Sequence, residues 1–342
     1  MTETLNSGEH FVPFVVDEEP FCVWDAHLSV HNKTFIRAIN PGYFSFLASL
    51  LDAAPEESSA GLMGIAARSF YVHALESTLA LLFAGLQAPQ GVFAWMQKYT
   101  PADLDALIRK VDQGAPIKTR CATPPHSWMQ ITRFYLAHMP QQLTASDGRK
   151  VEKSTLVPLF AKALQNLASD YLELETRHGY NAVKHGFRVM PGGVKATFVL
   201  EKTPGVPDES AVPFVIGGSN AGAALFDVAP DKVRKWHLRV SWKAQNWDFE
   251  QMVKRLQIAS AWMTCIKAAL RAHLNDADPP PKWVWFADAA LYESPWDRVE
   301  RVNNVSIPFG DFALPDEVTK EWILASYQQD SEVGCPDGLE QV

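Results

Sequence analysis

The sequence predicts an α+β fold that is predominantly α: a helical bundle with a small antiparallel β-meander inserted before a C-terminal long helix. Two observations predict this fold class. Apolar residues recur at the three- and four-residue spacing of amphipathic helices through most of the chain up to Gly186. Beyond Gly186, β-branched and aromatic residues alternate between clusters of Gly and Pro, which is typical of short strands joined by turns. We expect these parts to form one integrated domain.

The first segment, residues 1–34, is expected to be strand or irregular structure, because Pro13 and Pro20 interrupt its short apolar runs. Residues 35–186 then form the predicted bundle. Apolar periodicity places its earlier helices at 41–52, 62–86, 92–99, 101–112 and 127–138. The helix at 101–112 has the clearest start, since Thr100 can cap it and Pro101 suits its first position.

The last helix of the predicted bundle starts near Lys153 and ends at Gly186, a residue able to adopt the left-handed conformation that closes a helix. Its apolar stripe runs from Leu156 to Leu174. The same spacing then reaches three polar residues, His178, Asn181 and His185. Polar groups on an inward face cost free energy unless each finds a hydrogen-bond partner. The sequence therefore predicts a polar site at the end of this helix.

A second polar interruption lies inside the otherwise apolar helix predicted at 62–86. His73 and Glu76 are three residues apart and so share a face, and Arg68 lies about two turns before Glu76. A charged Glu on such a helix needs a cation, which three residues near the other interruption offer: Arg177, Lys184 and His185. We expect the two interruptions to face each other. The alternative is a structural ion pair that only fixes how the two helices pack.

The residue types at the end of the long helix suit phosphodiester cleavage. The imidazole of His185 can exchange a proton near neutral pH, and Lys184 or Arg177 can hold a phosphate or stabilise a developing negative charge. Asn181 can orient the phosphate or the imidazole. A simpler explanation for Lys184 is that the dipole favours positive charge at the C-terminal end of a helix.

This pattern resembles the HEPN superfamily, over about residues 60–190. Arg68 and His73 are separated by four residues, which fits the family motif of Arg, four to six residues, then His. Residues 180–186, Tyr-Asn-Ala-Val-Lys-His-Gly, are similar to a Tyr-Asn-x-x-Lys-His-Gly segment of uncharacterised bacterial HEPN-like proteins. Arg177 and His185 have seven intervening residues and depart from the motif.

The resemblance implies an RNA-binding protein or a metal-independent ribonuclease that works across a homodimer interface. Family members that lack the full motif are often non-catalytic binding modules. The candidate catalytic residues are His73, Glu76, Asn181, Lys184 and His185. The candidate ligand-binding residues are Arg68, Arg177, His178 and Tyr180.

The predicted β-meander covers residues 187–245, with strands at 187–190, 194–200, 212–216, 223–228 and 236–242. The first two strands are expected to form a hairpin around residues 191–193, Pro-Gly-Gly. Residues 217–222, Gly-Gly-Ser-Asn-Ala-Gly, fit neither a nucleotide-binding loop nor a nucleophile elbow, so they are expected to be a loop between strands.

The C-terminal long helix is expected within 246–278, starting at an Asn246 cap and ending near His273. Pro279 to Pro281 stop it and begin an aromatic and then acidic tail at 279–342. Four aromatic residues of this tail either pack on the bundle or dock a partner: Trp283, Trp285, Phe286 and Trp296.

Composition limits the classes of function. The chain has 342 residues, 47% of them hydrophobic and 20% charged, and a formal net charge of −8, which gives no overall field attracting nucleic acid or an anionic membrane. The 4 Cys residues are widely separated. We therefore expect a cytoplasmic protein with no membrane span, no cofactor and no metal. His27 and His31, four residues apart, lack the H-E-x-x-H pattern of a zinc helix.

The expected partners are RNA or another phosphate-bearing ligand, a second copy in a homodimer, and a protein bound through the Trp-rich tail. Two other functions stay open at this point. One is a non-catalytic interaction or structural protein whose buried polar cluster orders the helical core. The other is an enzyme acting on a small phosphorylated or nucleotide ligand.

Overall fold

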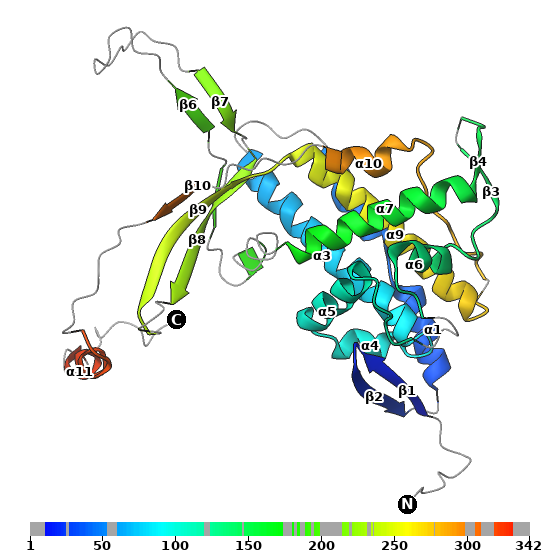
Figure 1. Cartoon of the computed structure of the whole chain (residues 1–342), viewed down its shortest axis with the longest axis horizontal. Helices are drawn as coiled ribbons and strands as arrows, with labels where there is room; N and C mark the ends of the chain where they lie inside the picture. Colours follow the sequence, from blue (N-terminus) through cyan, green and yellow to red (C-terminus); the bar gives the residue numbers. More distant parts are fainter. Residues whose placement is uncertain are drawn as a thin grey trace, which may run out of the picture.

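The computed structural model confirms the α+β fold, with a large helical bundle and small antiparallel sheets (Figure 1). It describes residues 11–24, 27–52, 60–119, 124–145, 147–173, 180, 183–184, 189–192, 195–198, 214–218, 221–230, 234, 236–276, 278–297, 305–308 and 318–330. In Figure 1 the strands β8 and β9 extend away from one end of the bundle.

The centre of the bundle is α3 (Ala60–Gln87), a 28-residue helix in which every residue from Thr78 to Gln87 is buried. A helix that is apolar all round must be covered on all sides. The second long helix, α9 (Phe249–His273), packs along it. By length and composition α3 is also apolar enough to cross a membrane, but 72% of its most apolar window is buried inside the protein. We therefore describe α3 as the core helix of this bundle.

Shorter helices surround this pair. They are α1 (Leu28–Ala38), α2 (Gly42–Asp52), α4 (Val92–Lys98), α5 (Pro101–Asp112), α6 (Trp128–Tyr135), α7 (Lys153–Leu172) and α10 (Ala290–Asp297). A further helix, α11 (Lys320–Asp330), lies apart from the bundle in Figure 1. The start of α5 is as predicted: the Thr100 hydroxyl accepts from the backbone N–H of Asp103, and the Asp103 carboxylate accepts from the backbone N–H of Thr100. This capping box satisfies N–H groups that have no partner within the helix.

Several helix boundaries differ from the prediction. Helix α6 ends at Tyr135 and not near residue 138. The helix predicted to run from 153 to 186 ends at Leu172, because the backbone of the following Glu173 is extended. Helix α1 lies partly in the segment predicted to be irregular. The cap of α9 is Asp248, whose carboxylate accepts from Gln251 N at 3.1 Å, and not Asn246, which ends a strand.

The largest sheet has four strands in the order β10-β9-β8-β5, all antiparallel. Its members are β5 (Val189–Pro191), β8 (Gly222–Pro230), β9 (Leu238–Asn246) and β10 (Val305–Pro308), and a separate hairpin joins β6 (Lys195–Phe198) to β7 (Phe214–Gly218). The expected hairpin of the first two strands is therefore wrong, since β5 pairs with β8. Two more hairpins pair β1 (Phe11–Val16) with β2 (Glu19–Trp24) and β3 (Gln142–Thr144) with β4 (Lys150–Glu152).

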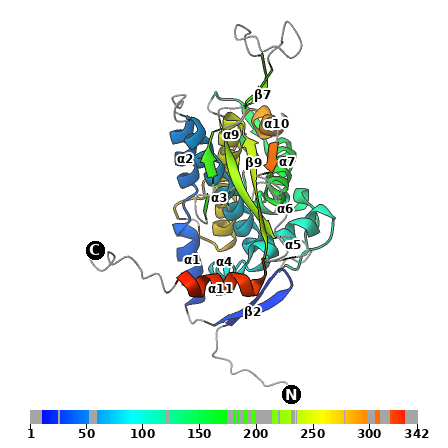
Figure 2. The ribbon, with the colours of Figure 1, turned by 90° about the vertical axis from the view of Figure 1, so that its left-hand side faces the viewer.

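Two glycines near the start of α3 explain how the sheet reaches the bundle. A Cβ atom on Gly61 would lie 2.7 Å from the backbone N of Gly192, and one on Gly64 would lie 3.3 Å from Ala221 Cα. The sheet backbone therefore approaches the helix backbone at these two positions (Figure 2). Glycine is suited to such contacts because it has no side chain. The pairing of β5 with β8 accompanies this docking. The alternation of residues along the sequence does not determine which strand β5 pairs with.

The aromatic part of the predicted tail covers the bundle. Tyr292 of α10 is almost fully buried, and its hydroxyl accepts from the backbone N–H of Phe286 at 2.8 Å. The other aromatic residues predicted either to pack here or to dock a partner also lie against the core: Trp283, Trp285 and Trp296. These side chains therefore pack on the bundle.

A buried glutamine at the end of α3 joins three other segments. The Gln87 Oε1 atom accepts from Asp17 N at 3.0 Å and from Trp95 Nε1 at 3.1 Å. Its Nε2 atom donates to the carbonyls of Asp17 at 3.1 Å and Lys118 at 2.9 Å. Because a buried amide without partners costs free energy, these four bonds specify where the β1–β2 turn meets the helix end.

A buried carboxylate just after α9 joins helix α1 to the end of α9. Asp276 accepts from Arg37 Nε and from Arg271 Nε, both at 2.9 Å, and Arg37 adds a second bond through Nη2. The hydrogen bond from Arg37, followed by that from Arg271, holds the pKa of Asp276 well below its usual range. The pair of guanidinium groups therefore keeps this carboxylate charged in the folded protein.

We predict that Asp276 makes folding stability sensitive to acid. Because its folded-state pKa is depressed, its stabilisation is fully present above the unfolded-state pKa of about 4 and is lost as the pH falls towards the folded-state pKa. Asp276→Asn should lower the free energy of unfolding at neutral pH by on the order of 2 kcal/mol. Urea denaturation at a series of pH values should show a flatter acid dependence for this variant. Glu293→Gln, at an exposed position of α10, should behave like the wild type.

We also predict that Gly85→Ala destabilises the bundle by about 1–3 kcal/mol. The added Cβ would overlap the Tyr135 hydroxyl oxygen, which donates to Leu82 O, and would lie 2.8 Å from Leu270 Cδ2. In a Tyr135→Phe background the hydroxyl is gone, so the same alanine should cost less. Equal costs of Gly85→Ala in the two backgrounds, measured by denaturation, would contradict this close contact.

Candidate functional site

The first polar group on α3 is Glu76, which is partly buried and faces the segment after α4. Its Oε1 atom accepts a hydrogen bond from the Tyr99 hydroxyl at 3.3 Å. The Tyr99 ring is held by stacking on Trp95, with ring centroids 5.2 Å apart and an interplanar angle of 12°. Trp95 is itself fully buried in the middle of α4. The packing of α4 on α3 therefore sets the position of this pair.

Tyr180 lies close enough to Glu76 for the two groups to affect each other. Burial first, and the negative charge of Glu76 second, raise the pKa of the Tyr180 hydroxyl. Burial, Glu76 and Tyr180 raise the pKa of Tyr99 in the same way. The Nζ atom of Lys184 lies 5.7 Å from the centroid of the Tyr180 ring, and this side chain is exposed. We call these four residues, Glu76, Tyr99, Tyr180 and Lys184, the Glu76 patch.

The Glu76 patch brings together three of the predicted site residues: Glu76, Tyr180 and Lys184. Of the predicted residues after α7, Tyr180 lies near Glu76 of α3. Glu76 accepts a hydrogen bond from the hydroxyl of a tyrosine, Tyr99, where a cation was expected. Tyr99 was missed because an aromatic residue at the end of an amphipathic segment carries no sign of a polar contact. Arg177, His178, Asn181 and His185 lie outside the described residues.

The structure places Arg68 and His73 on different sides of α3. The Arg68 guanidinium is buried 5.7 Å from the ring centroid of Trp247, which precedes α9. The His73 ring is exposed and meets the Phe44 ring of α2 edge-on, with centroids 5.4 Å apart. Five residues along a helix turn the side chain by about 140° around the axis. Arg68 and His73 therefore do not share one site within this chain.

A second polar group is buried where α3, α7, α9 and α10 meet. The Asp170 carboxylate accepts from Trp296 Nε1 at 3.0 Å, from Arg255 Nη1 at 3.4 Å and from the Tyr71 hydroxyl. Arg255 also donates through Nε to Pro295 O at 3.0 Å, and its guanidinium carbon lies 5.5 Å from the Trp296 ring centroid. We call Tyr71, Asp170, Arg255 and Trp296 the Asp170 cluster.

The burial and the hydrogen bonds of the Asp170 cluster indicate a structural role. The side chains of Arg255 and Asp170 are only 7% and 16% exposed. Burial first, and the charge of Asp170 second, raise the pKa of the Tyr71 hydroxyl well above its usual value. Tyr71 therefore stays protonated at neutral pH and donates to the carboxylate. The three donors come from three different helices, so the cluster fixes their relative positions.

The sequence carries a signal for the Asp170 cluster. Arg255 lies on α9 between Met252 and Ile258, both of which face the core, and Asp170 precedes the buried Tyr171. A charged residue on a buried helical face requires an opposite charge or a hydrogen-bond partner. Which of the many acidic residues meets Arg255 depends on how α7 crosses α9, and periodicity does not provide this.

Within the part of the chain that the structure describes, no group of three or more His, Cys, Asp or Glu side chains is placed to hold a metal ion. Comparison with protein-family models, curated proteins and solved structures finds no significant match to this chain.

We predict that Asp170→Ala lowers the free energy of unfolding by about 3 kcal/mol, because it leaves the buried guanidinium of Arg255 without its carboxylate. Trp296→Phe removes one donor and should cost about 1 kcal/mol. The measurement is chemical denaturation followed by tryptophan fluorescence. Gln165→Ala, at an exposed position of the same helix, should stay within about 0.5 kcal/mol of the wild type. A similar small effect for Asp170→Ala would contradict the structural role.

Proposed function

We propose that this protein binds single-stranded RNA through the Glu76 patch, without cleaving it. The observation that carries the proposal is the exposed Lys184 ammonium beside the half-buried Tyr180 ring, 5.7 Å from its centroid. Proteins that bind single strands combine aromatic rings, on which bases stack, with cations that contact the phosphates. The resemblance of residues 180–186 to a segment of HEPN-like proteins supports the same class of ligand.

The carboxylate in the patch favours a base over a phosphate as its contact. Glu76 would repel a phosphate, but a carboxylate accepts several hydrogen bonds and so has acceptor capacity beyond the bond from Tyr99. Exocyclic amino groups and ring N–H groups of bases are donors that match it. A base would therefore stack on Tyr180 and donate to Glu76, with its phosphate at Lys184. The net charge of −8 implies that binding depends on this local arrangement and not on a general field.

The positions of Arg68 and His73 favour binding over cleavage. Acid–base catalysis requires its groups within hydrogen-bond reach of one another through the substrate. Arg68 is buried against Trp247, whereas His73 is exposed beside Phe44. A motif built on these two residues is therefore divided between the interior and the surface. Any ribonuclease activity would have to depend on His185, which is the residue to test for it.

A second candidate is the non-catalytic interaction or structural protein, and the Asp170 cluster favours it. Its charged groups are satisfied from within the chain, as expected when a polar cluster orders a helical core. This function needs no ligand at the Glu76 patch. The two candidates therefore give opposite results in an RNA-binding experiment.

We predict that the wild-type chain binds a fluorescent single-stranded RNA in an anisotropy titration at low salt, and that the patch variants bind it more weakly. Tyr180→Ala should reduce affinity by about 1–3 kcal/mol through lost stacking. Lys184→Ala should weaken binding to all sequences and reduce the salt slope by about 1. The matched control is Lys150→Ala, an exposed lysine of β4, which should bind like the wild type.

Two outcomes would decide against the proposal. No RNA binding by the wild type, or equal binding by all four proteins, would leave the interaction protein as the better interpretation. Metal-independent degradation of the RNA that is abolished by His185→Ala, with the melting temperature unchanged, would instead establish the ribonuclease.

A further inference from the structure

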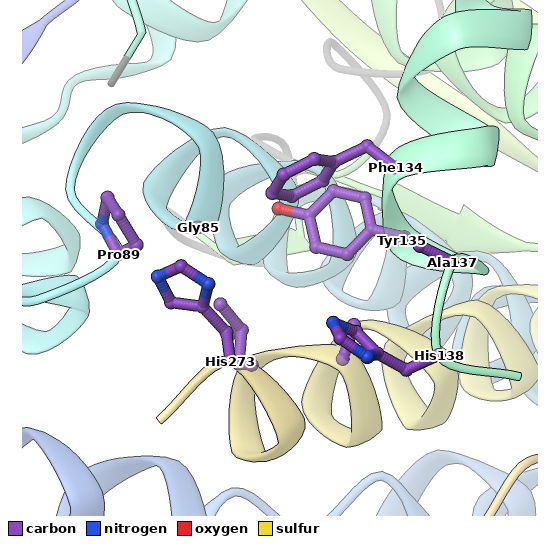
Figure 3. A pocket seen from close by; sticks show the side chains of 9 residues that line it. Gly85, Pro89, Phe134, Tyr135, Ala137, His138 and His273 are labelled. Atoms are coloured by element: carbon purple, nitrogen blue, oxygen red, sulfur yellow. The ribbon is translucent and has the colours of Figure 1, made fainter. Parts of the chain in front are cut away.

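A second site lies at the opposite end of α3 from the sheet, in a hollow of about 90 Å³. Figure 3 shows it between α3, α6 and α9, with the imidazoles of His138 and His273 at its edge. The residues that line it are Gly85, Pro89, Phe134, Tyr135, Ala137, His138, Ala269, Leu270 and His273. None of them belongs to the Glu76 patch or the Asp170 cluster.

The inner part of the hollow is apolar and aromatic. Its floor exists because Gly85 has no side chain: a Cβ there would overlap the Tyr135 hydroxyl and approach Leu270. The Tyr135 hydroxyl donates to Leu82 O, so this residue presents its ring to the hollow. Phe134 adds a second ring and is 36% exposed. An apolar group that enters the hollow would therefore meet aromatic rings.

The electrostatic character of the hollow comes from three helix ends. Helix α3 ends at Gln87, α6 at Tyr135 and α9 at His273, so all three C-termini meet around it. Each helix C-terminus carries a partial negative charge, which favours cations. One cation is already placed this way: the Lys153 ammonium donates to the carbonyls of Ala137 and Met139, both at 3.2 Å, just after α6.

Rings also lie at the edge of the hollow, where His138 and His273 place two imidazoles at the opening. Aromatic rings attract cations through their negative faces, and this is how proteins hold alkylated ammonium groups. A metal ion is less suited to the site, because the described lining offers two imidazoles above an apolar floor.

We propose that this hollow binds a small organic ammonium ion, with its alkyl groups against Tyr135 and Phe134 and its charge between the three helix C-termini. A ligand of this class carries both features that the hollow combines, an apolar surface and a positive charge. The site lies apart from the Glu76 patch and does not depend on the proposed RNA binding.

The test is a titration of the full chain with tetramethylammonium chloride, followed by the ¹H NMR resonances of the His138 and His273 imidazoles in mildly alkaline buffer. Each resonance is assigned by a His→Gln variant. The matched ligands are tert-butanol, which is neutral and similar in shape, and trimethylacetate, which is anionic. Tetramethylammonium should shift both imidazoles saturably and bind roughly tenfold more tightly than either analogue.

Two variants separate charge recognition from apolar contact. Phe134→Leu keeps an apolar side chain but removes the ring, so it should weaken tetramethylammonium binding roughly two- to fivefold and leave tert-butanol unchanged. The controls are Phe46→Leu on α2 and His126→Ala, both at exposed positions outside the hollow, which should bind like the wild type.

Several results would overturn the proposal. Equal affinity for tert-butanol and tetramethylammonium would show that the hollow recognises shape and apolar surface but not charge. Tighter binding of trimethylacetate would show that the imidazoles donate hydrogen bonds to an anion. A response of both imidazoles to stoichiometric Zn²⁺, with none to tetramethylammonium, would make it a metal site. The absence of any saturable shift in the wild type would remove the site altogether.

Discussion

The constraint on which the structure depends is the burial of the last ten residues of α3 on every side. A helix with ten consecutive buried residues, Thr78 to Gln87, has no face that tolerates water, so other elements must surround it. Elements from both halves of the chain do so, including β1, α4, α7, α9 and the sheet. Strand β1 of the N-terminal hairpin and the strands β5 and β8 therefore contact the same central helix.

Polar groups at the edges of this core differ in their hydrogen-bond partners and in their exposure to water. Gln87 is hydrogen-bonded to backbone groups and to the Trp95 indole, and Asp276 to two guanidinium groups, so each joins different segments of the chain. The Asp170 cluster does the same between helices. The Glu76 patch differs, because Tyr180 is half-buried and Lys184 is exposed. A polar group that is partly open to water can exchange its partners for a ligand, whereas a buried and satisfied one cannot.

The covered central helix also fixes where the partial negative charges of helix C-termini come together. A covered central helix must end somewhere, and α3 ends beside the C-termini of α6 and α9. Backbone carbonyls at such ends lack partners within their own helices. Lys153 satisfies two carbonyls just beyond α6, which shows how the fold neutralises such an end with a cation. Gly85 leaves space there that a side chain would fill, so packing and electrostatics together define the hollow.

The sequence by itself determined the fold class, the central helix with Glu76 as a polar residue on it, the Thr100 cap of α5 and the end of α9 at His273. Each follows from local periodicity or from chemistry within a few residues. Only the tertiary structure decided the end of α7 at Leu172, the pairing of β5 with β8, the addition of β10, and the partners of Asp170 and Glu76. These depend on which distant segments meet across the core, and residue spacing along the chain does not contain that information.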